Sequence, residues 1–229
     1  MKNRLIWMLC FSLLLIFSVM PTTSAAEITR WALYDFALDS VSIQSGISRI
    51  VAEEKLIPVG IESLQTKMSV LFVSNSSVGA TAWKIESYAN AELFTAGMND
   101  HLAQGYTPVD VSQERSYLSV LYLKLQSATD EWFWNVMNNK PETVRQEIEK
   151  RVSQGLIPIG ITMLDQRYAV LFVKSDAIRV THWAIKVLPM ERESLIADIN
   201  EKIREGYLPW GFLAGKERAN IVFLRMKDE

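Results

Sequence analysis

The sequence contains few of the residues from which proteins build cross-links and metal sites. It has one cysteine and two histidines in 229 residues. Cys10 lies in an apolar run near the N-terminus, and His101 and His182 stand far apart, outside any Cys/His ligand spacing. Because a zinc site takes three or four ligands at defined spacing, we expect neither a disulfide nor a bound metal.

Sequence signatures of catalysis are also missing. The ten glycines are scattered rather than gathered into a phosphate-binding loop, and neither histidine stands beside a Gly-x-Ser-x-Gly motif. We therefore nominate no catalytic residue and no cofactor, and we interpret His101 as an exposed helix residue and His182 as a polar strand position. A Ser-His-Asp triad stays open as an alternative, because its members need not be neighbours in the chain.

The charge balance argues against two classes of partner. The chain has 24 Lys and Arg residues against 26 Asp and Glu residues, a net charge of −2, and no block of basic residues. Nucleic acids and anionic lipids attract basic surfaces, so neither is an expected partner.

The N-terminus has the pattern of a secretory signal peptide. Lys2 and Arg4 precede an apolar run from Leu5 to Met20, and small residues follow up to Ala26. The alternative is an uncleaved membrane anchor, but 16 apolar residues fall short of the roughly 20 that a span requires. We expect residues 1–26 to be removed and residues 27–229 to form one periplasmic or secreted repeat domain that has no membrane span.

A direct repeat organises the remaining chain. Residues 56–85 and 156–185 agree at 13 of 30 positions without a gap, where unrelated sequences would agree at about two. A weaker period of 50 residues divides each copy. The same landmarks, a tryptophan, a proline and a four-residue apolar run, occur four times and predict units at residues 27–78, 79–128, 129–178 and 179–229. The stronger repeat groups these units into halves at residues 27–128 and 129–229.

Each unit is predicted to fold as β-α-β-β, which makes the fold class α+β. The tryptophan opens a first strand, and apolar residues four apart, such as Val144, Ile148 and Val152, indicate a helix. A hairpin follows the proline. The right-handed crossover rule places the third strand between the first and the second, antiparallel to both. The sheet, or sheets, should carry helices on one face and either form a continuous curved or closed sheet of about 12 strands or divide into two equivalent halves.

Helix ends are predicted three residues before each proline. Gly105, Gly155 and Gly206 occupy this position, and glycine adopts the left-handed cap conformation at no steric cost. Unit one has Lys55 instead, which predicts either a strained cap or a helix that ends in another way.

Aromatic residues supply the best binding candidates. The four repeated tryptophans are expected in the core, since they recur with the scaffold landmarks. Residues that break the repeat are better candidates for specific contacts, and a groove lined by them would stack on a sugar or a peptide. These candidates are Trp134, Trp210, Tyr106, Tyr207, Asp110 and His182. The alternative is that they simply pack between units.

Two segments carry a family resemblance. Gly105-Tyr106-Thr107-Pro108 and Gly206-Tyr207-Leu208-Pro209 follow a Gly-Tyr-x-Pro pattern between helix and hairpin. In this the chain resembles the bacterial tandem-repeat modules that accompany serine-hydrolase domains, including the polyglycine hydrolases. The hydrolase domains use Ser-x-x-Lys, which is absent from this sequence. The resemblance therefore implies accessory repeats with a recognition or scaffolding role.

Three functional hypotheses follow. The first is an exported, non-catalytic binding or scaffolding module for a protein, peptide or cell-envelope component. The second is an extracytoplasmic hydrolase with a site between units, and the third is a structural or inhibitory subunit of an envelope complex.

Overall fold

Four β-α-β-β units follow one another in the computed structural model, which describes residues 30–227 except 115, 128, 139 and 177. The expected signal peptide, residues 1–26, lies outside the described residues. The first unit comprises β1 (Trp31–Ala37), α1 (Ser40–Glu54), β2 (Leu56–Leu64) and β3 (Lys67–Ser74), followed by the short helix η1 (Asn75–Ser77). The second comprises β4 (Ala82–Tyr88), α2 (Ala91–Ala103), β5 (Tyr106–Glu114) and β6 (Tyr117–Lys124). The third comprises β7 (Thr129–Val136), α3 (Pro141–Ser153), β8 (Ile157–Leu164) and β9 (Arg167–Ser175). The fourth comprises β10 (Val180–Pro189), α4 (Arg192–Arg204), β11 (Leu208–Ala214) and β12 (Arg218–Met226).

Each unit forms its own three-stranded antiparallel sheet. The strand orders are β1-β3-β2, β4-β6-β5, β7-β9-β8 and β10-β12-β11. The third strand of every unit therefore lies between the first and the second, which confirms the predicted order. These middle strands are buried over their apolar runs, because the unit's own helix and the neighbouring unit cover them from both sides.

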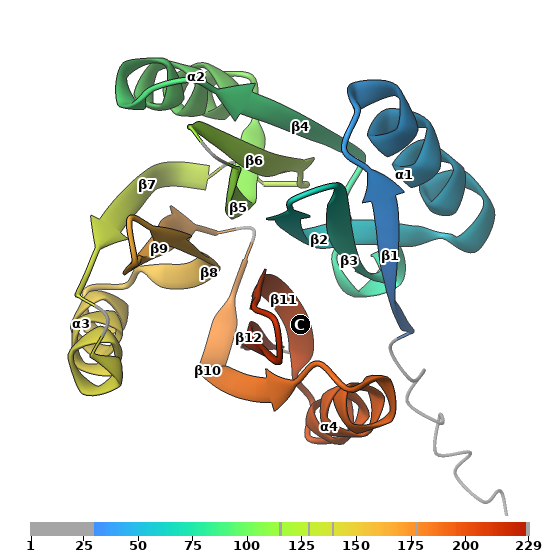
Figure 1. The fold of residues 1–229 in the computed structure, drawn as a ribbon. Coiled ribbons are helices and arrows are strands. Elements are labelled where there is room, and N and C mark those ends of the chain that lie inside the picture. Colours follow the sequence, from blue (N-terminus) through green and yellow to red (C-terminus); the bar gives the residue numbers. More distant parts are fainter. Residues whose placement is uncertain (1–29, 115, 128, 139, 177, 228–229) are drawn as a thin grey trace, which may run out of the picture.

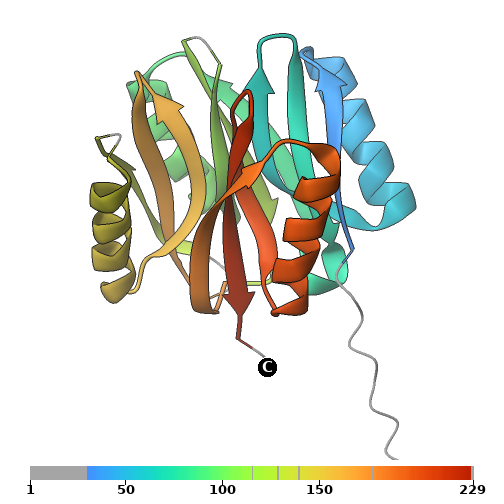
Figure 2. The same ribbon diagram turned by 60° about the horizontal axis from the view of Figure 1, so that its bottom comes forward.

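The four sheets are arranged in a ring. The second strands lie innermost: β2 contacts β5, β5 contacts β8, β8 contacts β11, and β11 returns to β2 (Figure 1). The first strands and the helices lie on the outside, and the side view shows the helices around the stacked strands (Figure 2). Of the two predicted arrangements, the continuous curved or closed sheet is not found, because the inner strands meet without a backbone ladder and the four sheets stay separate.

The helices begin and end as their sequences dictate. Asp39, Asn90 and Glu191 cap three of them by accepting a hydrogen bond from a first-turn amide. Pro141 stands in the first turn of α3, where its missing N–H costs nothing. Each helix buries one apolar face against its own sheet, as α1 does with Ile43, Ile47 and Ile50.

The four helix ends share a left-handed residue. Gly105, Gly155 and Gly206 have φ of 79°, 83° and 85°, and Lys55 has φ of 59°. Lys55 thus holds the same conformation as the glycines, which identifies it as the strained cap foreseen for unit one. Its ammonium donates a hydrogen bond to the Ala52 carbonyl at 2.8 Å.

A β-bulge in each inner strand brings four backbones together at the ring axis. The register shifts after Pro58, Pro108, Pro158 and Pro209. The residues that follow the bulge are Gly60, Asp110, Gly160 and Gly211. A Cβ on Gly160 would lie 3.0 Å from the Asp110 Cα, and one on Gly211 would lie 2.6 Å from the Ile159 carbonyl oxygen. Glycine is therefore required for the backbones to approach so closely.

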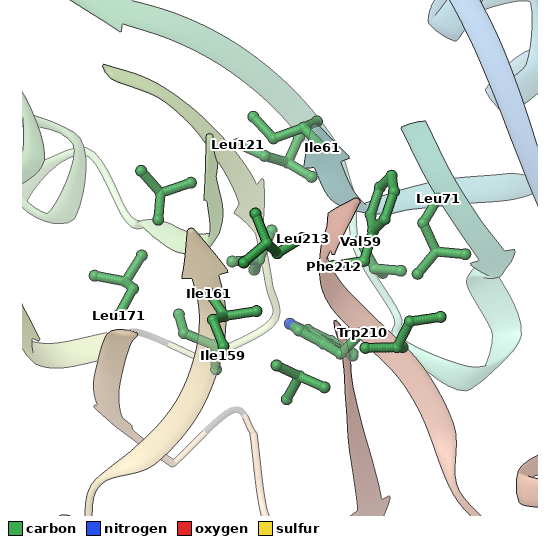
Figure 3. Packing of buried hydrophobic residues seen from close by; sticks show 14 of the residues in the cluster. Val59, Ile61, Leu71, Leu121, Ile159, Ile161, Leu171, Trp210, Phe212 and Leu213 are labelled. Atoms are coloured by element: carbon green, nitrogen blue, oxygen red, sulfur yellow. The ribbon is translucent and has the colours of Figure 1, made fainter. Parts of the chain in front are cut away.

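The hydrophobic core surrounds this axis. Figure 3 shows inward-facing residues of all four units, among them Val59, Ile159 and Trp210. These three stand at equivalent positions of their units, and all are 0 % exposed. The larger Trp210 side chain fills space that valine or isoleucine leaves in the other units.

The Lys55 cap provides a stability test. Lys55→Gly should raise the free energy of unfolding by about 1 kcal/mol, because glycine adopts positive φ without the steric cost of a Cβ. Gly155→Ala is the matched reverse variant: its Cβ would meet no atom within 4 Å, so only backbone strain acts, and it should lower stability by about 1 kcal/mol. Urea unfolding measures both, and a less stable Lys55→Gly protein would contradict the interpretation.

Candidate ligand groove between the third and fourth units

A cavity lies between α3 and β10. Its volume is about 610 Å³, within the range of small-ligand sites. Along one side it is lined by Val144 and Ile148 of α3, and along the other by residues 183–187 of β10. We call this cavity the α3/β10 groove. Ile161, Tyr168 and Asn220 complete its lining, together with Arg145 and Glu149.

Two aliphatic side chains line the groove at positions where the preceding interface has two aromatic rings. Between the second and third units the equivalent positions hold Phe94 of α2 and Trp134 of β7, whose rings pack with centroids 5.6 Å apart. Between the third and fourth units these positions hold Val144 and Ile185. Aliphatic pairs also stand at these positions at the other two interfaces, Ile43 with Ile85 and Leu195 with Leu33, so the aromatic pair is particular to the junction of the second and third units. At the junction of the third and fourth units the space beside the aliphatic pair is open.

A tryptophan–asparagine hydrogen bond that joins two other pairs of units is absent from the described residues of this interface. The Trp132 Nε1 donates to Asn99 Oδ1 of the preceding helix at 2.9 Å, and Trp31 Nε1 donates to Asn200 Oδ1 at 2.8 Å. The equivalent of Trp132 in the fourth unit is Trp183, which faces α3, where Glu149 replaces the asparagine. Glu149 instead accepts from Arg145 Nε at 2.9 Å. Within the described part of the chain the Trp183 indole N–H makes no hydrogen bond, so it is free to serve a ligand.

The lining of the groove is mostly apolar, with charged residues at its mouth. Its walls are mostly aliphatic and aromatic, and its mouth carries the Arg145–Glu149 pair, whose side chains are 78 % and 52 % exposed. Val187, 55 % exposed, lies at its rim. The described lining of the groove holds no histidine, serine, threonine or cysteine.

The structure does not bring the six predicted binding residues into one site. Trp134 packs half-buried against Phe94, in the interface that is filled. Tyr106 and Tyr207 occupy equivalent places, each beneath a lysine ammonium, Lys124 at 5.6 Å and Lys202 at 5.5 Å from the ring centroid. The expected common groove is therefore absent among these residues.

The other three candidates have separate environments. Trp210 and Asp110 are 0 % exposed, so neither reaches solvent, and a ligand outside the core cannot contact them. His182 is exposed on β10 and lines a small hollow of about 120 Å³ beside Gly155 and Pro158. Its polar strand position agrees with the interpretation of the sequence.

His101 is the clearest correction among the single residues. It was expected on an exposed helix surface, but it is 4 % exposed and packs against the Tyr122 ring at 4.3 Å. Its Nε2 lies 3.3 Å from Glu86 Oε2, to which the Tyr88 hydroxyl donates at 3.2 Å. The four repeated tryptophans were expected in the core. They are instead half-buried and pack against the hydrophobic core.

Asp110 collects backbone donors at the ring axis. Its Oδ2 accepts hydrogen bonds from the amides of Ile61 at 2.8 Å and Phe212 at 3.2 Å. Burial raises the pKa of this carboxyl well above its usual range, and the amides of Ile61, Val111, Phe212 and Ile161 oppose that rise. These four amides stand at equivalent positions of the four units, so a single side chain serves the whole ring.

A second buried carboxyl lies close to Asp110. Glu62 is 6 % exposed. Burial, followed by the charge of Asp110, raises its pKa to about 9, and a hydrogen bond from the Ser112 hydroxyl only partly offsets the rise. The pKa values of both carboxyls are raised and the two groups interact, so their titrations are coupled.

The groove residues were missed at the sequence level for an identifiable reason. Trp134 is an extra aromatic residue and was expected to contact a ligand, whereas the residue that lines the groove is Ile185, at the equivalent position of the fourth unit.

Comparison with known proteins adds no identification: no protein-family model and no curated protein matches this chain. Within residues 30–227, less the gaps named above, no helix is long and apolar enough to cross a bilayer, and no cluster of three or more His, Cys, Asp or Glu side chains is placed to hold a metal ion.

Asp110→Asn should lower the free energy of unfolding by about 1 kcal/mol or more, because a neutral amide oxygen accepts from the Ile61 and Phe212 amides more weakly than a carboxylate oxygen does. Asp165→Asn, in an exposed turn with φ of 46°, is the matched control and should leave stability nearly unchanged. Chemical denaturation compares the two variants. Equal stabilities would show that the amides do not depend on the carboxylate.

Stability should fall as pH rises. Glu62 has its pKa raised to about 9 from 4.5, so the folded protein holds a proton that the unfolded chain releases between these values. Stability from this group is therefore fully present below about pH 4.5 and decreases toward pH 9, by up to about 1.4 kcal/mol per pH unit. Glu62→Gln should flatten this slope and stabilise the protein at pH 8. Denaturation curves from pH 5 to 9 that have the same slope in both proteins would contradict the assignment.

Proposed function

We propose that the chain is an exported, non-catalytic binding module that holds an apolar or aromatic group of its ligand in the α3/β10 groove. One observation carries the proposal. The space that Phe94 and Trp134 fill between the second and third units is a cavity of about 610 Å³ between the third and fourth. The N-terminal signal-peptide pattern supports export.

The chemistry of the groove supports binding rather than turnover. Aliphatic floor residues such as Ile148 and Ile161 favour burial of an apolar group, and Trp183 and Tyr168 offer aromatic faces for stacking. The Trp183 N–H and the Asn220 amide add polar groups that orient a ligand. A recognition role also agrees with the resemblance to accessory repeat modules.

The proposal is tested by filling the groove from within. The double variant Val144→Phe/Ile185→Trp transfers the aromatic pair found between the second and third units to the interface between the third and fourth. N-acetyl-L-tryptophanamide, used as the probe, should shift the amide NMR signals of α3 and β10 in the wild-type protein. The double variant should lose at least tenfold in probe affinity while keeping its melting temperature, because the new rings occupy the site.

Val41→Trp is the matched control. It adds an indole to a position of α1 that is 75 % exposed and should leave probe binding unchanged. The proposal fails if the probe does not shift groove signals in the wild-type protein, or if the double variant binds it as well as the wild-type protein does.

A further inference from the structure

The outer edge of the fourth sheet is open where it meets the groove. β10 pairs only with β12, and β12 pairs in turn with β11. Within the described residues, positions 183–187 make no main-chain hydrogen bond apart from the ladder to β12. At 10 residues β10 is also the longest of the outer strands, against 7, 7 and 8 for β1, β4 and β7.

The groove reaches the backbone of this edge strand. Successive side chains of a strand point to opposite faces, so Trp183, Ile185 and Val187 share the face toward α3. Ala184 and Lys186 belong to the other face, yet they also line the groove. A cavity lined by five consecutive strand residues includes the main chain of the strand, whose free N–H and C=O groups are a template for another extended chain.

The charges near this edge favour some binding partners over others. β1, β4 and β7 carry acidic residues, namely Asp35, Glu86, Asp130 and Glu131, whereas β10 carries none. Arg145 and Glu149 compensate each other at the groove mouth. Lys186 has no described carboxylate within ion-pair distance. Two β10 edges pairing with each other would bring their lysines together, whereas an acidic chain would gain from Lys186.

The protein itself shows which side chain fits the groove. Between the second and third units, the equivalent space holds the indole of Trp134 and the ring of Phe94, which form a tilted pair. An aromatic side chain that enters the α3/β10 groove would restore these contacts against Val144 and Ile148, beside the free indole N–H of Trp183.

We infer that the ligand is an extended, acidic peptide segment that adds as a strand to the open edge of β10 and inserts one aromatic side chain into the α3/β10 groove. The inference rests on the proposed function and names its ligand. Main-chain hydrogen bonds to β10 give affinity, the aromatic pocket sets the register, and Lys186 selects the charge.

The test uses a panel of acetylated, amidated pentapeptides. The parent has the pattern aspartate–valine–tryptophan–valine–threonine, and the panel replaces tryptophan by phenylalanine or alanine and aspartate by lysine. Calorimetry with residues 27–229 should show tryptophan and phenylalanine peptides binding at least tenfold more tightly than the alanine peptide. The aspartate peptide should bind more tightly than the lysine peptide, and Lys186→Glu should reverse that preference.

Backbone methylation tests strand addition directly. N-methylation at alternate peptide nitrogens should weaken binding at least tenfold in one alternating set and have little effect in the other, because only every second amide faces β10. Equal effects in both sets, or none, would overturn strand addition.

Two further outcomes separate this inference from the function on which it rests. If N-acetyl-L-tryptophanamide binds but no aromatic peptide of the panel binds more tightly, the groove stands and the peptide assignment is wrong. If a β-linked oligosaccharide displaces the probe where the peptides do not, the ligand is a glycan and the inference is overturned. If the probe itself fails to bind, the proposed function fails first.

Discussion

The close approach of four backbones at the ring axis is the constraint on which the rest of the structure depends. Glycine in the first, third and fourth units permits the approach, and Asp110 in the second unit accepts hydrogen bonds from amides that would otherwise be buried and unpaired. The inner strands are further joined by side-chain hydrogen bonds, since Ser63 N donates to Ser112 Oγ and Gln113 N to Thr162 Oγ1. Side chains thus replace the backbone ladder that a continuous sheet would have.

Much of the fold follows from the sequence, and the exceptions have physical causes. Local signals are sufficient for the β-α-β-β unit, because prolines, helix caps and apolar runs act within a few residues of themselves. Lys55 could be recognised as unusual for the same reason. The ring could not be derived from the sequence, because it depends on which side chains meet across units. In the sequence Asp110 is only one position where glycine is replaced, whereas in the structure it lies against Gly160 and Gly211.

The candidate groove lay beyond sequence reasoning for a related cause. An extra aromatic residue is conspicuous in a repeated sequence, whereas a smaller residue is not. Smaller side chains, however, are the ones that leave room for a cavity. Trp134 of the third unit stands at the position equivalent to Ile185 of the fourth unit, and it is Ile185 that lines the groove. Only the packing of Phe94 against Trp134 shows that Val144 and Ile185 leave an equivalent space unfilled. His101 shows the same limit, since nothing local in α2 signals that Tyr122 covers it.

The contact that closes the ring has a consequence for how the chain folds. The amide of Phe212 reaches Asp110 across 102 positions of sequence, and β11 completes the ring against β2. Three units alone leave Asp110 without one of its donors and leave the inner faces of the first and third units uncovered. Contacts so distant along the chain form late and slowly. We therefore expect the native state to be reached only after the last fifty residues have emerged, so the order of synthesis determines when the protein becomes compact.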